Sequence, residues 1–214
     1  MEIFVYHTPD LVPDLSRNAR KGGLNLDMPA CAIVIDVLRA TTTMATALQS
    51  GAEAIQVFDD LDELFRLSKK WPADQRLLAG ERSGEKLDGF DLGNSPSECT
   101  PAQVGGKRIF MSTTNGTRAL ERVQQVPILL TASLTNRAAV VRYLLQEQPH
   151  TVWIVAAGWR GSFSLEDTIC AGAIACGLSV ERGSDCAGDD EAIAAMALFE
   201  QWQTRLPQLL RYAH

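Results

Sequence analysis

The stretch Ala32–Thr43, AIVIDVLRATTT, joins a nearly continuous apolar run to a polar turn that is rich in threonine. Such a run without polar alternation is typical of a strand that helices cover on both faces of a parallel or mixed sheet. A second run of this kind, VWIVAA, occupies Val152–Ala157. Five shorter apolar runs are expected to form further strands: Ile3–Tyr6, Ala54–Phe58, Arg76–Ala79, Arg108–Met111 and Ile128–Thr131.

Helix-forming segments alternate with these strands along the chain. Thr42–Ser50 is followed by Gly51, a common stop signal at the C-terminal end of a helix. Glu166–Val180 is rich in Ala and Gly, which predicts a closely packed neighbour. The other expected helices are Asp60–Lys70, Thr117–Val123, Asn136–Gln148 and Asp189–Arg205. The alternation predicts an α/β fold, a three-layer α/β/α sandwich with a mixed, mostly parallel sheet. The length of 214 residues suits one domain over residues 1–214 or two closely packed subdomains.

The composition excludes several classes of protein. The net charge is −6 and no basic run occurs, so a nucleic-acid partner is not expected. The five cysteines show no C-x-x-C spacing, which favours reduced thiols over a disulfide framework or a zinc site. No signal peptide or membrane-spanning run is evident. We therefore expect a cytoplasmic protein that binds no membrane, and the sequence leaves open whether it forms a homo-oligomer.

In α/β sheets, ligands collect outside the carboxyl ends of the strands, where helix N-termini favour phosphate groups. The turn after the first apolar run carries Asp36, a carboxylate that needs a partner such as Mg²⁺ if it is buried. Arg39 offers a planar fork that matches phosphate or sulfonate oxygens. Thr41, Thr42 and Thr43 are expected to supply hydroxyl groups and the helix N-cap. An Asp36–Arg39 salt bridge with a threonine cap is the alternative interpretation.

The second polar turn is Ser112–Arg118, STTNGTR. Six of these seven residues can donate side-chain hydrogen bonds, and Gly116 lets the backbone approach a ligand closely. An Asn-Gly turn joined to a capped helix would produce the same pattern without any ligand. The turn becomes a candidate anion site because a second threonine-rich turn with an arginine follows another strand.

The third polar turn runs from Gly158 to Thr168 and contains Arg160, Glu166 and Asp167. Ser164, three residues before Asp167, is typical of a capping box, which would account for one of the two acids. Two adjacent acids and an arginine at a strand end also fit metal binding and anion contact.

The segment Gly80–Gly106 is rich in polar residues, glycine and proline, and loops of this length in compact domains usually serve a function. Glu81 and Asp91 are further oxygen ligands for a metal, and Arg82 is a further anion-binding fork. Solvated surface charges are the alternative interpretation of all three residues.

Four blocks of the sequence, IDVLRATTT, AGERSGEKLDGFDLGNSP, TTNGTRAL and GSFSLEDTICAGA, resemble in order the signature blocks of the 2-phosphosulfolactate phosphatase (ComB) family. They fall within about Ile33–Gly172. The resemblance implies a ComB-like phosphatase that uses Mg²⁺ to convert (2R)-2-phospho-3-sulfolactate and water to (2R)-3-sulfolactate and phosphate. In methanogens this step belongs to coenzyme M biosynthesis, although bacteria that make no coenzyme M also have family members. Family chains usually continue with a Ser/Ala-x-His-Gly segment, whereas this sequence stops at His214.

A small substrate with phosphate, carboxylate and sulfonate groups would require the polar turns to converge on one pocket. The residues predicted to be catalytic are Asp36, Arg39, Asn115 and Asp167. The predicted metal ligands are Asp36, Glu81, Asp91, Glu166 and Asp167. The predicted substrate-binding residues are Thr41, Thr42, Thr43, Arg82, Thr113, Thr114, Gly116, Thr117, Arg118, Arg160 and Ser164. The alternatives are a phosphatase for another phosphorylated 2-hydroxy acid and a non-catalytic protein that binds phosphate anions.

Overall fold

The computed structural model describes residues 1–14 and 28–213, and the strands in this part of the chain form two four-stranded sheets. All strands of the first sheet are parallel, in the order β1-β8-β2-β7. Their bounds are Glu2–Tyr6 (β1), Cys31–Ile35 (β2), Ile128–Ala132 (β7) and Thr151–Ala156 (β8). Because the strands are parallel, all four carboxyl ends lie at the same edge of this sheet.

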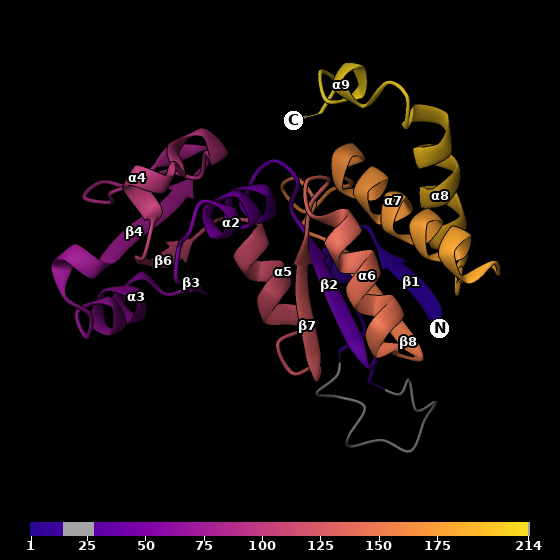
Figure 1. The fold of residues 1–214 in the computed structure, drawn as a ribbon, viewed down its shortest axis with the longest axis horizontal. Helices are drawn as coiled ribbons and strands as arrows, with labels where there is room; N and C mark the ends of the chain where they lie inside the picture. Colours follow the sequence, from indigo (N-terminus) through magenta and orange to yellow (C-terminus); the bar gives the residue numbers. More distant parts are fainter. Residues whose placement is uncertain (15–27, 214) are drawn as a thin grey trace.

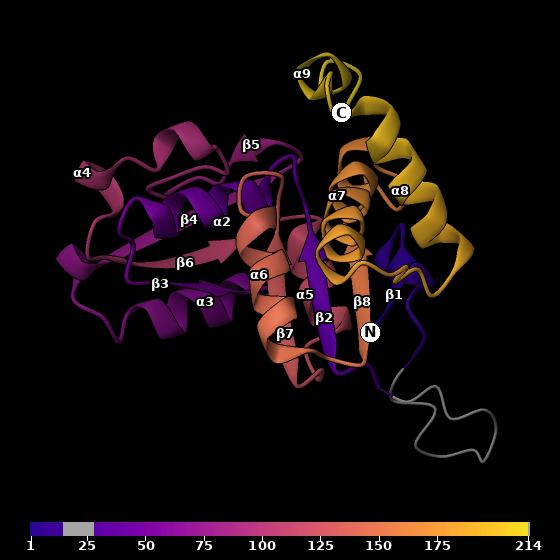
Figure 2. The same cartoon turned by 45° about the vertical axis from the view of Figure 1, so that its right-hand side comes forward.

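The second sheet has the order β3-β6-β4-β5 and lies beside the first (Figures 1 and 2). Three of its strands are parallel, whereas β5 is a short antiparallel addition to the end of β4. The bounds are Ala54–Val57 (β3), Arg76–Arg82 (β4), Glu85–Lys86 (β5) and Arg108–Ser112 (β6).

Helices cover both faces of the first sheet. One core packs the sheet against α6 (Arg137–Glu147) and α7 (Leu165–Arg182), and α8 (Asp190–Trp202) lies against α7 and the β1 edge. The other face is covered by α5 (Gly116–Arg122). Ala119 of this helix and Val123, its C-cap, pack in one core with strand residues such as Val34 and Trp153. Side chains of alternating strand positions therefore enter different cores, as the continuous apolar runs require.

The second sheet is also covered on both faces. Helix α2 (Ala40–Gln49) packs on one face with the short α4 (Pro101–Val104), and α3 (Leu61–Ser68) packs on the other. The final described helix is α9 (Leu206–Leu209). Three 3₁₀ segments complete the connections: Pro9–Leu11, Ala73–Gln75 and Pro96–Glu98.

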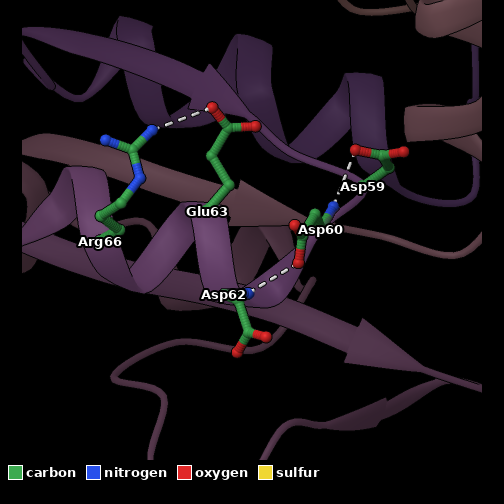
Figure 3. Close-up of polar contacts among 5 residues, drawn as sticks. All are labelled: Asp59, Asp60, Asp62, Glu63 and Arg66. Carbon is green, nitrogen blue, oxygen red and sulfur yellow. Dashed lines mark hydrogen bonds and ion pairs between the residues drawn. The ribbon is translucent and has the colours of Figure 1, made fainter.

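The N-terminus of α3 illustrates how local sequence sets a helix boundary (Figure 3). Asp60 is the N-cap, and its Oδ1 accepts a hydrogen bond from the backbone N–H of Asp62 at 2.8 Å. Asp59 accepts from the N–H of Asp60 at 2.8 Å, and Glu63 pairs with Arg66 at 3.3 Å. Acids at the first turn satisfy free N–H groups and complement the helix dipole.

The predicted α/β architecture with mostly parallel strands and helical outer layers is confirmed. Each of the seven predicted strands and six predicted helices has a counterpart whose ends differ by a few residues. The strands are divided between two sheets, however, and the segment Gly80–Gly106 contains β5 and α4 in addition to loop. None of the helices in residues 1–14 and 28–213 has the length and apolar character needed to cross a membrane.

Candidate active site

The chain crosses between the two sheets at two corners, and these corners touch. Strand β2 belongs to the first sheet, but the following α2 packs on the second. Strand β6 belongs to the second sheet, but the following α5 packs on the first. A Cβ atom at Gly116 would lie 2.9 Å from the Ala40 Cβ and 2.9 Å from Asp36 Oδ2. Only glycine therefore allows this approach, and one oxygen of Asp36 faces the second corner.

The first corner is closed by Asp36 and by threonine hydroxyl groups. Asp36 Oδ1 accepts from the N–H of Ala40 at 3.1 Å, so the aspartate takes the capping role expected of the threonines. Thr41 Oγ1 donates to the carbonyl of Asp36 at 2.8 Å, and Thr42 Oγ1 donates to the carbonyl of Val37 at 2.7 Å. The prediction of a threonine N-cap was wrong, because the helix begins at Ala40 and all three threonines lie inside it.

Within the described part of the chain, the side chain of Arg39 forms no ion pair with Asp36; of Arg39, only the backbone N–H bonds to that carboxylate. Its Nη2 donates to the carbonyl of Gly84 at 3.1 Å, beyond the end of β4, and the Leu38–Arg39 peptide bond is cis. The alternative interpretation, an Asp36–Arg39 salt bridge, is therefore wrong. The Arg39 side chain instead connects the first corner to the β4–β5 hairpin. This leaves the rest of the guanidinium group able to bind another oxygen-bearing group.

Asp167 ties a third corner, the Gly158–Thr168 turn that joins β8 to α7, to the first. Its Oδ1 accepts from the N–H of Val37 at 2.8 Å, and its Oδ2 accepts from the N–H of Gly158 at 3.2 Å. Ser164 caps α7 by accepting from the N–H of Asp167, which is half of the predicted capping box. The carboxylate does not complete that box, so capping alone does not explain its presence.

Glu81 ties the second corner to the end of β4 in the same way. Its Oε1 accepts from the N–H of Thr114 at 2.7 Å, and its Oε2 accepts from the N–H of Gly84 at 2.7 Å. Within the second corner, the Thr117 hydroxyl accepts from the N–H of Thr113 at 3.1 Å. Hydrogen bonds to buried carboxylate and hydroxyl groups therefore hold the three predicted turns next to one another.

Four acids in this region are almost completely buried, with exposed fractions of 7% for Asp36, 7% for Glu81, 5% for Glu166 and 2% for Asp167. Burial raises the pKa of Asp36 to about 6, and the charges of Glu81 and Glu166 add to the effect, against hydrogen bonds from backbone N–H groups. Burial and the charge of Asp36 hold the pKa of Asp167 well above its usual value. The cluster therefore favours a bound proton or cation.

A pocket of about 500 Å³ opens in front of these corners. Each of the three turns contributes at least one side chain to it, as does the Gly80–Gly106 segment. The lining residues are Asp36, Leu38, Arg39, Glu81, Ser83, Gly84, Asn94, Thr114, Asn115, Trp159 and Arg160. The convergence that the sequence predicted is thus present in the structure.

Arg160 reaches the pocket from the tip of a tight turn. The backbone groups of Trp159 and Ser162 bond to each other in both directions at 2.9 Å, and Arg160 and Gly161 have φ angles of 51° and 78°. These angles are those of a two-residue turn with left-handed central residues. The Arg160 guanidinium lies 5.3 Å from the centre of the Trp159 ring, which restricts its orientation.

The family model described as 2-phosphosulpholactate phosphatase matches residues 20–214. The chain belongs to the 2-phosphosulfolactate phosphatase family. The expected enzyme class, a phosphoric-monoester hydrolase, is the class of this family. The three corners and their pocket carry the blocks on which the resemblance was based.

Several relatives in this family are closely similar. A protein of Synechocystis sp. named "Probable 2-phosphosulfolactate phosphatase" is 56% identical over 214 residues, which is all of this chain and 84% of the relative. A protein of Nostoc punctiforme with the same name is 56% identical over 216 residues, covering all of this chain and 83% of the relative. One from Microcystis aeruginosa is 55% identical over 206 residues, or 96% of this chain and 81% of the relative.

Not every predicted residue of the family site lies at the pocket. Arg118 pairs with Asp10 and lines a different, more exposed hollow, because it follows Gly116 by two helical positions and faces another side of α5. Asp91 is exposed and accepts from the N–H of Leu78 at 2.8 Å, which anchors its loop to β4. These contacts do not fit the predictions that Arg118 binds substrate and that Asp91 binds a metal.

Other predicted residues support the pocket without lining it. Arg82 donates to Ser112 Oγ at 3.0 Å and to the carbonyl of Glu81 at 2.8 Å. Thr43 is buried in α2, and its hydroxyl has no hydrogen-bond partner in the described residues. Sequence reasoning also missed lining residues, namely Leu38, Ser83, Gly84, Asn94 and Trp159. Most of them lay inside the quoted blocks, but no charge distinguished them.

A magnesium ion fits only a part of the predicted ligand set. In the part of the chain that the structure describes, no three acidic, histidine or cysteine side chains are placed to enclose a metal ion. Mg²⁺ in enzymes is usually held by one or two carboxylates together with water and substrate phosphate. Asp36 lines the pocket, and the negative charge of Glu166 acts on it. Both carboxylate oxygens of Glu81 accept hydrogen bonds from backbone N–H groups, and so do both oxygens of Asp167. Asp36, which lines the pocket, is therefore the acid that would hold the ion, and Glu166 adds negative charge beside it.

A larger cavity of about 630 Å³ lies between α2, α3, α5 and the strands β3 and β7. Its charged lining residues are Asp59, Glu63 and Glu121, all acidic. An anionic substrate would be repelled there, whereas the smaller pocket of Arg39 and Arg160 has two cationic groups to bind it.

Proposed function

We propose that this chain hydrolyses (2R)-2-phospho-3-sulfolactate to (2R)-3-sulfolactate and phosphate in the pocket between the three corners, with the help of Mg²⁺. The observation that carries the proposal is the presence of two arginines, Arg39 and Arg160, and the carboxylate Asp36 in one pocket. Among the described residues, neither arginine forms an ion pair with a carboxylate. The names of the curated relatives support this choice of substrate.

The arginines suit a substrate with several anionic groups. A guanidinium group binds phosphate, carboxylate or sulfonate through two parallel hydrogen bonds. Arg39 comes from the first corner and Arg160 from the third, so they can bind different ends of one small molecule. Thr114 and Asn115 of the second corner add neutral hydrogen-bonding groups between them. Leu38 and Trp159 supply apolar surface that reduces the access of water.

Hydrolysis of a phosphate monoester depends mainly on positioning and on stabilising charge on the phosphoryl oxygens. Asp36 Oδ1 is held by the N–H of Ala40, which orients the carboxylate toward the second corner. Asp36, with the charge of Glu166 nearby, would hold Mg²⁺, and the ion would supply positive charge that stabilises the phosphoryl group. The arginine that binds the phosphate end of the substrate stabilises the same charge, and the other arginine binds the opposite end.

The test is release of inorganic phosphate by the purified full chain from phosphosulfolactate, with Mg²⁺ and with EDTA. We expect turnover that requires Mg²⁺, and a kcat/KM for phospholactate and phosphoglycerate that is lower by about 10²-fold or more, because a site built for a sulfonate leaves polar groups unpaired without it. Higher kcat/KM for a carboxylate analogue would move the assignment to another phosphorylated 2-hydroxy acid. Binding without any phosphate release would indicate a non-catalytic anion-binding protein.

A further inference from the structure

Asn94 lines the pocket and has an unusual environment. Its side chain is only 6% exposed, and its Oδ1 is buried without a hydrogen-bond partner in the described residues. Buried carbonyl oxygens of side chains are nearly always paired, because leaving one unpaired destabilises the folded state. An unpaired acceptor at a ligand pocket is therefore a candidate for contact with a ligand.

The backbone just before Asn94 is held by two hydrogen bonds. The N–H of Gly93 donates to Glu98 Oε2 at 2.7 Å. The N–H of Gly80 donates to the carbonyl of Leu92 at 3.1 Å, which fastens the loop to β4 just before Glu81. Asn94 is thus positioned by the same strand end that positions Glu81 in the pocket.

The chemistry of the substrate limits what can pair with this oxygen. Phosphate, carboxylate and sulfonate groups carry acceptors only when ionised, so none of them can donate to an amide oxygen. Among the reactants, the hydrogen-bond donors are the attacking water and the hydroxyl group that the reaction releases. We propose that Asn94 is a catalytic residue that accepts a hydrogen bond from the attacking water, an inference that rests on the proposed phosphatase function.

In this step the water oxygen forms a bond to phosphorus, and the ester P–O bond breaks with its electron pair going to the leaving oxygen. One proton of the water is balanced by the proton on the released hydroxyl group, and the other stays on phosphate. A carboxamide cannot take up the proton at neutral pH, so Asn94 orients the water and is not a general base. Carboxamide side chains have this role in other phosphoryl-transfer enzymes.

The test compares Asn94→Leu, which keeps the size but removes the acceptor, with Asn136→Leu as a matched control. Asn136 also follows a strand, but its Oδ1 accepts from the N–H of Ser133 at 2.7 Å and its Nδ2 donates to Thr131 at 3.1 Å. We expect Asn94→Leu to have a Tm equal to or above that of wild type and a kcat lower by about 10²-fold, with little change in KM. Asn136→Leu should lower Tm and keep kcat.

Asn94→Ala serves as a second variant, because it removes the acceptor without demanding space for leucine. A kcat within threefold of wild type for both Asn94 variants would overturn the inference. So would a fall in Tm like that of the Asn136 variant, or a rise in KM with unchanged kcat, since these indicate structural and substrate-binding roles. Failure of the wild-type chain to release phosphate in the same assay would instead contradict the proposed function.

Discussion

Replacement of Asp36 by asparagine should stabilise the metal-free protein at neutral pH and abolish its phosphatase activity. The aspartate is buried beside other acids, and its pKa is raised to about 6. Asparagine keeps the shape and an oxygen that can accept from the N–H of Ala40, as Asp36 Oδ1 does at 3.1 Å. The substitution therefore removes the buried charge while keeping the bond that closes the corner.

The size of the effect follows from the pKa. An aspartate has a pKa of 3.8 when unperturbed, so the folded chain binds this proton more tightly than the unfolded chain by a pKa difference of about 2. At about 1.36 kcal/mol per pKa unit, the ionised carboxylate destabilises the fold by about 3 kcal/mol. The wild type is free of this penalty below pH 4 and acquires it as the pH rises from about 4 to 6. For a chain of this length, that corresponds to about 6–12 °C in Tm.

The assay is thermal unfolding in EDTA between pH 4 and 8. The Tm of the wild type should fall relative to Asp36→Asn over the range from about pH 4 to 6, and the variant should be the more stable protein at pH 7.5. Added Mg²⁺ should raise the Tm of the wild type much more than that of the variant, because ligands stabilise only the state that binds them. Phosphate release by the variant should fall by more than tenfold.

Asp91→Asn is the matched control, since Asp91 is exposed and bonds to the N–H of Leu78 outside the pocket. It should keep wild-type activity and the wild-type dependence of Tm on pH. The reasoning is refuted if Asp36→Asn is less stable than wild type at pH 7.5, or if the two proteins show parallel Tm curves from pH 4 to 8.

Three further substitutions test other parts of the structure. Arg39→Ala should lower kcat/KM by about 10²-fold. Arg118→Ala should keep kcat/KM within about twofold and change stability by less than about 1 kcal/mol, because its ion pair with Asp10 is exposed. Equal losses of kcat/KM in the two variants would contradict the assignment of the pocket. Gly116→Ala should lower stability by about 1–3 kcal/mol and reduce activity, because the new Cβ would lie 2.9 Å from Asp36 Oδ2; urea unfolding with wild-type values would mean that the corners are not in contact. Gly172→Ala would place a Cβ 2.0 Å from the Ala195 carbonyl oxygen, between α7 and α8. We expect the free energy of unfolding to fall by about 1–3 kcal/mol or more, with an unchanged kcat of the folded fraction. A Tm within about 1 °C of wild type would disprove that packing.

Much of the fold was predictable because its signals are local. The continuous apolar runs in Ala32–Val37 and Val152–Ala157 predicted strands covered on both faces. The structure forms them as Cys31–Ile35 and Thr151–Ala156 and buries the first completely. The Ala- and Gly-rich α7 is closely packed by α8, as its composition predicted. The two-residue strand β5 and the four-residue α4 were not predicted, because such short elements show no hydrophobic period.

The division of the strands between two sheets was not predictable from periodicity. A buried strand shows the same apolar pattern whichever sheet it joins. The crossing of the chain at Asp36 and again at Gly116 depends on which face α2 and α5 cover, and that is a property of packing. Those crossings place the two corners in contact and form the pocket.

By itself, the sequence determined the alternation of strands and helices, the polar turns at the strand ends, and the family blocks that those turns carry. Only the tertiary structure decided which charges share a pocket. It brought Arg160 to Arg39 but directed Arg118 to Asp10, and it left the oxygen of Asn94 without a partner. The physical reason is that residue type and local period depend on near neighbours in the chain. Contacts such as that of Asp167 with Val37, 130 residues apart, depend on how the whole chain packs.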